Sequence, residues 1–180
     1  WKRMPGARTH DTITLLLAAP AFAAGYAIFG EFSAAAAGGA AFLFGGLMFG
    51  PDLDTASRQY SRWSIFKVLW LPYSAFFPHR SRWSHGLIFG TLFRVIYFLG
   101  VLTLAAFVGT MVAAAVTGEE VLSLNELMSE WQTIGSWVNA NLGRQFVPAV
   151  FAGMWLGAAS HTVTDIAGTF VKTGRVSDFF

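Results

Sequence analysis

The sequence predicts an all-α integral membrane protein: a bundle of about four transmembrane helices with amphipathic segments at the interfaces. Three observations support this class. The 180 residues are 54% hydrophobic and only 12% charged, whereas charged residues make up about 25% of a soluble domain. The mean hydropathy is +0.52. Four separate apolar stretches are each near or above the ~20 residues that cross a hydrocarbon core. Since MPGARTHD reads like a natural start, we expect one membrane domain over residues 4–180.

The four apolar stretches define the expected spans in order. The first runs over residues 12–30, and the second, rich in alanine and glycine, over 33–50. Because so few residues separate them, these two stretches form a helical hairpin. Alanine and glycine favour insertion only weakly, so the second stretch could instead be a buried core helix. The third span is expected at 87–116 and the fourth at 146–170.

The basic residues are distributed unevenly about these spans. All but two of the twelve lie on the side that carries both termini and the loop 51–85, the exceptions being Arg94 and Arg144. The positive-inside rule therefore places this side in the cytoplasm, and the chain in an inner, cytoplasmic-type membrane. Arg94 falls inside the third span. It could snorkel to the interface, or it could reach a carboxylate or a substrate phosphate.

Two connecting segments are expected at the membrane surfaces. The inner loop 51–85 mixes basic and aromatic residues, which is typical of an interfacial anchor, although it could also hold anionic lipid or shape an entrance for lipid. The outer segment 119–144 predicts an amphipathic helix on the lipid headgroups or, equally, a cap packed over the bundle. Its expected apolar face consists of Leu122, Leu127, Trp131, Ile134 and Trp137. Membrane lipid is thus the expected partner, and nucleic acid is not, because the basic residues are few.

Four polar motifs fall at the inner ends of the predicted spans, and they use every histidine in the chain. His161 and Asp165 are four residues apart and share one face of a helix. Ionisable residues buried in a span are costly, so their default interpretation is functional. The motifs are Thr9-His10-Asp11, Asp52-Leu53-Asp54, the segment from His79-Arg80 to Ser84-His85, and the segment from Ser160-His161 to Asp165.

This set of residue types predicts a metal site. The chain has no cysteine, so a metal must be held by nitrogen and oxygen ligands, which are those of catalytic zinc and of mixed two-metal sites. In Asp-x-Asp, one of Asp52 and Asp54 could bridge two ions while the other holds one. The guanidinium groups of Arg80 and Arg82 could clamp phosphate or carboxylate oxygens. Each motif alone has an ordinary explanation as a headgroup contact, a cap or an anchor. Their coincidence on one side favours a shared site.

The order of these motifs resembles a known family. RTHD, PDLD, HR…SHG and SH…D are similar to the uncharacterised membrane metal-binding proteins related to the LexA-regulated, membrane-bound metal-dependent hydrolases. The resemblance covers residues 4–178 and is closest in MPGARTHD, LMFGPDLDTAS, RWSIFKVLWLPY and HRSRWSHG. It implies a helical membrane protein with a metal-dependent hydrolase site. The ligand set that it implies is His10, Asp52, Asp54, His79, His85, His161 and Asp165, with Asp11 as a ligand or as the partner that orients His10.

The leading hypothesis is therefore a membrane-embedded metallohydrolase. One or two divalent ions, zinc or alternatively manganese or iron, would activate water against a phosphoester or another ester or amide of a lipid-like substrate. Asp52 or Asp165 would act as bridge or general base, and Arg80 or Arg82 would bind the anion. The alternative is a non-catalytic metal-binding subunit of a larger membrane complex, whose Ala/Gly surfaces pack on protein partners. A divalent-ion transporter is disfavoured because the bilayer midplane would hold almost no polar residues.

Overall fold

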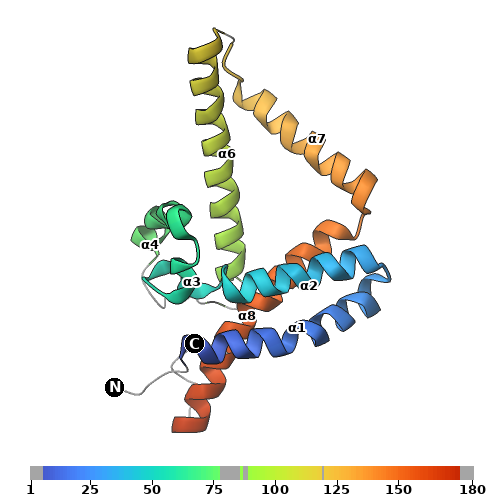
Figure 1. The fold of residues 1–180 in the computed structure, drawn as a ribbon, viewed down its shortest axis with the longest axis vertical. Coiled ribbons are helices and arrows are strands. Elements are labelled where there is room, and N and C mark those ends of the chain that lie inside the picture. The colour runs from blue at the N-terminus through green and yellow to red at the C-terminus, as the bar shows by residue number, and fades with distance from the viewer. Residues whose placement is uncertain (1–5, 78–85, 87–88, 119, 175–180) are drawn as a thin grey trace.

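The computed structural model describes residues 6–77, 86, 89–118 and 120–174, and the regular structure in these ranges is helical throughout (Figure 1). The predicted all-α class is therefore confirmed. The helices are α1 (Ala7–Phe29), α2 (Phe32–Leu47), the 3₁₀ helix η1 (Pro51–Asp54), α3 (Arg58–Ser61), the 3₁₀ helix η2 (Ser64–Trp70), α4 (Leu71–Phe76), α6 (Phe89–Thr117), α7 (Leu124–Leu142) and α8 (Phe146–Thr173).

Among the described residues, α1, α6 and α8 are long and apolar enough to cross a membrane. The second apolar stretch differs from the prediction, because α2 has 16 residues and ends at Leu47. At ~1.5 Å per residue it reaches roughly 24 Å, less than the ~30 Å of a hydrocarbon core. The cause lies in Gly50-Pro51. Proline disfavours helical backbone at the residue before it, and Gly50 is extended ahead of η1.

Helix α2 lies between α1 and α8 and packs closely on both of them (Figure 1). Glycines allow the close approach to α8. A Cβ atom on Gly45 would overlap the carbonyl oxygen of Met154, and one on Gly157 would overlap the carbonyl oxygen of Phe42. Only glycine permits backbones to come this near. The Ala/Gly surfaces of these two stretches, which the alternative hypothesis uses for packing on protein partners, thus pack on each other.

The segment from Phe49 to the end of α4 forms a packed aromatic layer against the start of α6. Its buried centre includes Phe49, Trp70 and Tyr73, and the Tyr97 hydroxyl of α6 donates to the backbone carbonyl of Leu69. The opposite face of the same segment exposes apolar side chains such as Ile65. This layer ties η1 to α6.

Helix α7 begins with a capping box, in which Ser123 Oγ accepts from the Glu126 N–H and the Glu126 carboxylate accepts from the Ser123 N–H. It crosses from the far end of α6 to the start of α8 (Figure 1). The expected apolar face divides in two. Leu127 is buried and Trp131 Nε1 donates to Thr103 Oγ1 of α6 (3.1 Å), whereas Trp137 is exposed.

Candidate metal centre

The centre forms where α1 and α8 meet. Helix α1 begins at Ala7, so His10 lies inside its first turns instead of preceding the helix as predicted. Thr14 Oγ1 lies 3.5 Å from Ser160 Oγ on α8. Beside that contact the rings of His10 and His161 stack, with centroids 3.7 Å apart and planes 9° from parallel.

Asp165 joins the two histidines. One carboxylate oxygen lies 3.2 Å from His10 Nε2, and the other lies 3.6 Å from His161 Nε2, which is four residues earlier on α8. All three residues are buried, and their candidate ligand atoms lie within 4.8 Å of one another. His10, His161 and Asp165 could therefore hold a metal ion.

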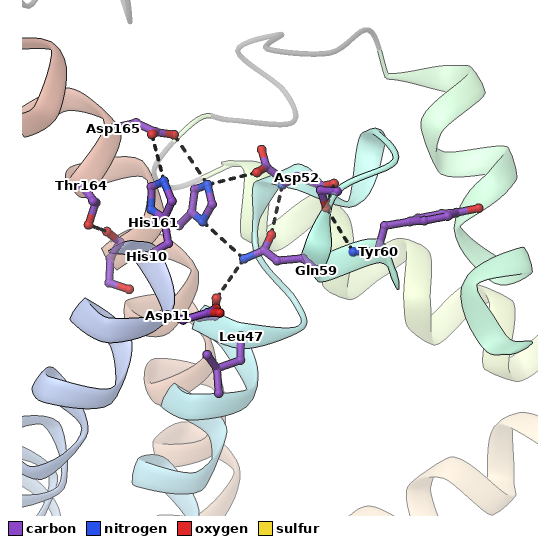
Figure 2. A network of polar contacts seen from close by, with 12 residues as sticks. His10, Asp11, Leu47, Asp52, Gln59, Tyr60, His161, Thr164 and Asp165 are labelled. Atoms are coloured by element: carbon purple, nitrogen blue, oxygen red, sulfur yellow. Dashed lines mark hydrogen bonds and ion pairs between the residues drawn. The ribbon is translucent and has the colours of Figure 1, made fainter. Parts of the chain in front are cut away.

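Asp52 approaches the same group from η1. Its Oδ2 lies 3.3 Å from His161 Nε2, so Figure 2 shows two carboxylates directed at one imidazole nitrogen. The Asp52 side chain is 28% exposed, whereas that of His161 is 4% exposed. The group is thus enclosed on the side of α1 and α8 and reaches the surface at Asp52.

The chemistry of these donors fits a divalent cation. Two carboxylates in a largely buried place are costly unless a positive charge offsets them. A proton on His161 Nε2 can serve only one carboxylate well, whereas an ion could bind both. His10 Nδ1 is buried and has no hydrogen-bond partner among the described residues, so the polar contact of this ring is made through Nε2 toward the cluster. Imidazole with carboxylate suits zinc, manganese and iron.

Asp11 points away from this cluster. Arg62 binds its carboxylate with two hydrogen bonds of 2.9 and 2.6 Å, and Arg58 Nη1 lies 3.3 Å from Asp11 Oδ2. Arg62 Nη1 also donates to the backbone carbonyl of Leu47 (2.7 Å). Consecutive helical residues point about 100° apart, so His10 faces α8 while Asp11 faces α3. Asp11 thereby connects α1 to α3 and the end of α2.

Asp54, the other carboxylate of the Asp-x-Asp motif, is buried. The positive charge of Arg94 on α6 interacts with both Asp54 and Asp52. Arg94 is 2% exposed, which rules out snorkelling, and its Nη2 donates to Thr91 Oγ1 (3.0 Å). Burial raises the pKa of the neighbouring Tyr73, and the positive charge of Arg94 acts in the opposite sense. Asp54, Tyr73 and Arg94 form a second buried polar group that adjoins η1.

One residue of the centre, Gln59 on α3, escaped the sequence analysis. It is buried, and its amide contacts Gly46, Asp52 and His161 (Figure 2). Glutamine is neither charged nor a common metal ligand, so chemistry alone does not single it out. The one feature of the sequence that could have indicated Gln59 is its position, five residues after Asp54 in the segment that turns back toward the helices.

The remaining predicted site residues, His79, Arg80, Arg82 and His85, lie outside the described residues. Their roles stay predictions. Among the described candidates, the structure brings together His10, Asp52, His161 and Asp165. Asp11 instead binds arginine side chains, and Asp54 is buried near the charge of Arg94.

The fold and the centre define an all-α protein with three candidate membrane-spanning helices and a buried His/Asp group that could bind a metal. A family model described as uncharacterized metal-binding protein (DUF2227) matches residues 5–175, and the chain belongs to this family. No curated protein and no solved structure matches the chain. The family thus agrees with the metal-binding part of the resemblance seen in the sequence. It supplies no link to the LexA-regulated hydrolases.

Proposed function

We propose that this chain is an integral membrane, metal-dependent hydrolase that holds a divalent ion between His10, His161 and Asp165. The observation that carries the proposal is the asymmetry of the centre: three donors are buried, and Asp52 stands at the exposed edge. Structural metal sites are closed by their ligands, whereas catalytic sites keep one position open. The uneven distribution of basic residues supports a cytoplasmic location for the centre.

The residues have separable roles in this proposal. A divalent ion in the centre would lower the pKa of water and polarise a phosphoester or another ester. Zinc is the first candidate, with manganese and iron as alternatives, because each accepts imidazole and carboxylate. Asp52, half-buried at the edge, stands beside the three donors and can accept a proton from an entering water. Arg80 or Arg82 would bind the anionic part of the substrate.

A groove beside the centre supports a lipid-like substrate. It has a volume of about 530 Å³ and lies between α1 and α8, where its walls include Ile13, Val163, Ala167 and Val171. Thr9 and Thr164 also line it, and they are the chain neighbours of His10 and Asp165. Because both helices are candidate membrane spans, the groove would open onto the hydrocarbon. An acyl chain of the substrate is the occupant that suits these walls.

The proposal is tested with metal-free protein in detergent, reloaded in turn with zinc, manganese or iron. We expect hydrolysis of lipid phosphoesters to require one of these ions. Asp52→Asn should retain part of the metal through the other three residues and lose at least about 100-fold in turnover, as expected when a positioned proton acceptor is removed. Metal binding without hydrolysis of any phosphoester, ester or amide tested would overturn the catalytic assignment.

The groove gives a separate prediction. Ala167→Phe adds a ring to an exposed position in the groove wall. We expect it to reduce hydrolysis of long-chain substrates by about ten-fold, because one bulky group in an apolar pocket changes binding by roughly 1–3 kcal/mol. Short-chain substrates and metal content should be unaffected. Leu156→Phe, at an exposed position of α8 outside the groove, is the matched control. Equal effects on long and short chains would argue against an acyl-chain site.

A non-catalytic metal-binding subunit remains the second candidate, favoured by one contact. Asp52 Oδ2 and Asp165 Oδ2 both lie near His161 Nε2, at 3.3 and 3.6 Å, so four donors could close around one ion. Such a shell would hold zinc tightly and leave no position for water. Absorption spectroscopy of the cobalt form distinguishes the two cases, since a closed four-donor shell does not change its spectrum when a competing anion is added.

A further inference from the structure

We infer that Gln59 is a positioning residue that holds Asp52 at the edge of the metal centre. The inference rests on the proposed metal site and extends it to a residue without charge or metal affinity of its own. Gln59 is only 5% exposed, and a buried amide normally has its polar atoms hydrogen-bonded. The partners of this amide are what connect it to the centre.

One side chain here joins three elements. Gln59 Oε1 accepts from the backbone N–H of Asp52 (3.3 Å), and Gln59 Nε2 donates to the backbone carbonyl of Gly46 at the end of α2 (2.8 Å). The same nitrogen lies 3.4 Å from His161 Nδ1 on α8 and, because an amide nitrogen only donates, bonds to that ring nitrogen when it carries no proton. Figure 2 shows the amide between Asp52 and His161. Gln59 therefore fixes the distance between η1 and the His161 ring.

The backbone is shaped to admit this amide. A Cβ atom on Gly50 would overlap the amide group of Gln59, so the glycine leaves space that the amide fills. Two further hydrogen bonds hold the same turn: Ser57 Oγ donates to the Asp52 carbonyl (2.8 Å) and accepts from the Tyr60 N–H (3.1 Å). Within the part of the chain that the structure describes, the side chain of Ser57 bonds to Asp52 and Tyr60 and not to His161, whereas Gln59 reaches the ring. Mutation can therefore remove the hydrogen bonds of Ser57 and those of Gln59 separately.

Loss of the Gln59 amide would leave the Asp52 N–H and the Gly46 carbonyl without this partner. The η1 turn would then be free to shift, and the Asp52 carboxylate would move relative to His161 Nε2. Removing the hydrogen-bond partners that orient metal ligands typically costs about 10–100-fold in metal affinity. We expect a loss of that size, since a shift of η1 withdraws the negative charge of Asp52 and leaves the three donors in place.

The test is Gln59→Met, which preserves length and volume while removing both amide groups. The dissociation constant for cobalt or zinc, measured by competition titration in detergent, should rise about 10–100-fold. The absorption spectrum of the cobalt form should change as the Asp52 carboxylate moves away from the centre. Ser57→Ala loosens the same turn without touching the ring, and its dissociation constant should stay within about three-fold of wild type. Gln59→Glu keeps an acceptor for the Asp52 N–H and should bind the ion more tightly than Gln59→Met.

A double-mutant cycle shows whether Gln59 acts through Asp52. In the Asp52→Asn background, Gln59→Met should weaken metal binding by less than about three-fold, because residues that act as one unit are not additive. An equal loss in both backgrounds overturns the inference while leaving metal binding by the wild-type chain intact. A wild-type chain that binds no ion overturns the proposed function together with this inference.

Discussion

Replacing Asp165 with asparagine is expected to abolish stoichiometric metal binding. Among the described residues, Asp165 contacts Nε2 of both His10 and His161, at 3.2 and 3.6 Å. Asparagine has the same shape, but it removes the negative charge and presents an amide donor where an ion would bind. We expect the dissociation constant to rise at least about 1000-fold, which corresponds to roughly 4 kcal/mol. Metal content by mass spectrometry and competition titration measure the loss.

The fold should survive this change. Asparagine keeps the shape of the side chain, and in the metal-free chain its neutral amide relieves the repulsion between the two carboxylates, Asp52 and Asp165, that approach His161 Nε2. Thermal unfolding of the metal-free variant should therefore match that of the metal-free wild type. Glu130→Gln, at an exposed position on α7, is the control and should bind metal normally. If Asp165→Asn were purified with the metal content of the wild type, the ion would have to lie elsewhere in the chain.

Much of the fold could be predicted because the length of an apolar stretch and the polar residues that bound it are local features of the sequence. The stretches that became α1, α6 and α8 are long and uninterrupted, so their helical nature depends little on tertiary context. The end of α2 was harder to predict, because apolar residues continue up to Gly50 and the proline that stops the helix acts on the residue before it. The burial of Leu127 and the contact of Trp131 with α6 depend on how α7 packs, which no local pattern specifies.

The centre was predictable where spacing alone determines geometry. His161 and Asp165, at positions i and i+4, share a face on any helix. His10 and Asp11 are adjacent, so their sequence cannot show which of them faces α8. That choice follows from the packing of α1, which sets Asp11 against Arg62. In the same way, the sequence cannot show which of the two carboxylates of η1, Asp52 or Asp54, faces His161. Gln59 was missed because its importance comes from the three elements that it joins.

Replacing Gly157 with leucine is expected to have the largest effect on the fold. A Cβ atom at this position would overlap the carbonyl oxygen of Phe42 and lie 2.8 Å from the backbone nitrogen of Gly46. Backbone atoms cannot move aside as a flexible side chain can, so α2 and α8 must separate. Overpacking costs about 1–3 kcal/mol where side chains can yield. Separating two helices should cost more, a large share of the roughly 5–15 kcal/mol that stabilises a folded domain.

Gly109→Leu provides the matched control, since a Cβ atom on this α6 glycine meets nothing within 4 Å. We expect it to unfold at the wild-type temperature or above, because leucine favours helix by about 1 kcal/mol over glycine. Gly157→Leu should unfold at a much lower temperature and also lose metal, because the Gly46 backbone that it displaces accepts the hydrogen bond from Gln59. Asp165→Asn should lose metal alone. Unchanged unfolding of Gly157→Leu would mean that α2 and α8 do not pack backbone to backbone, and that the centre is assembled by other contacts.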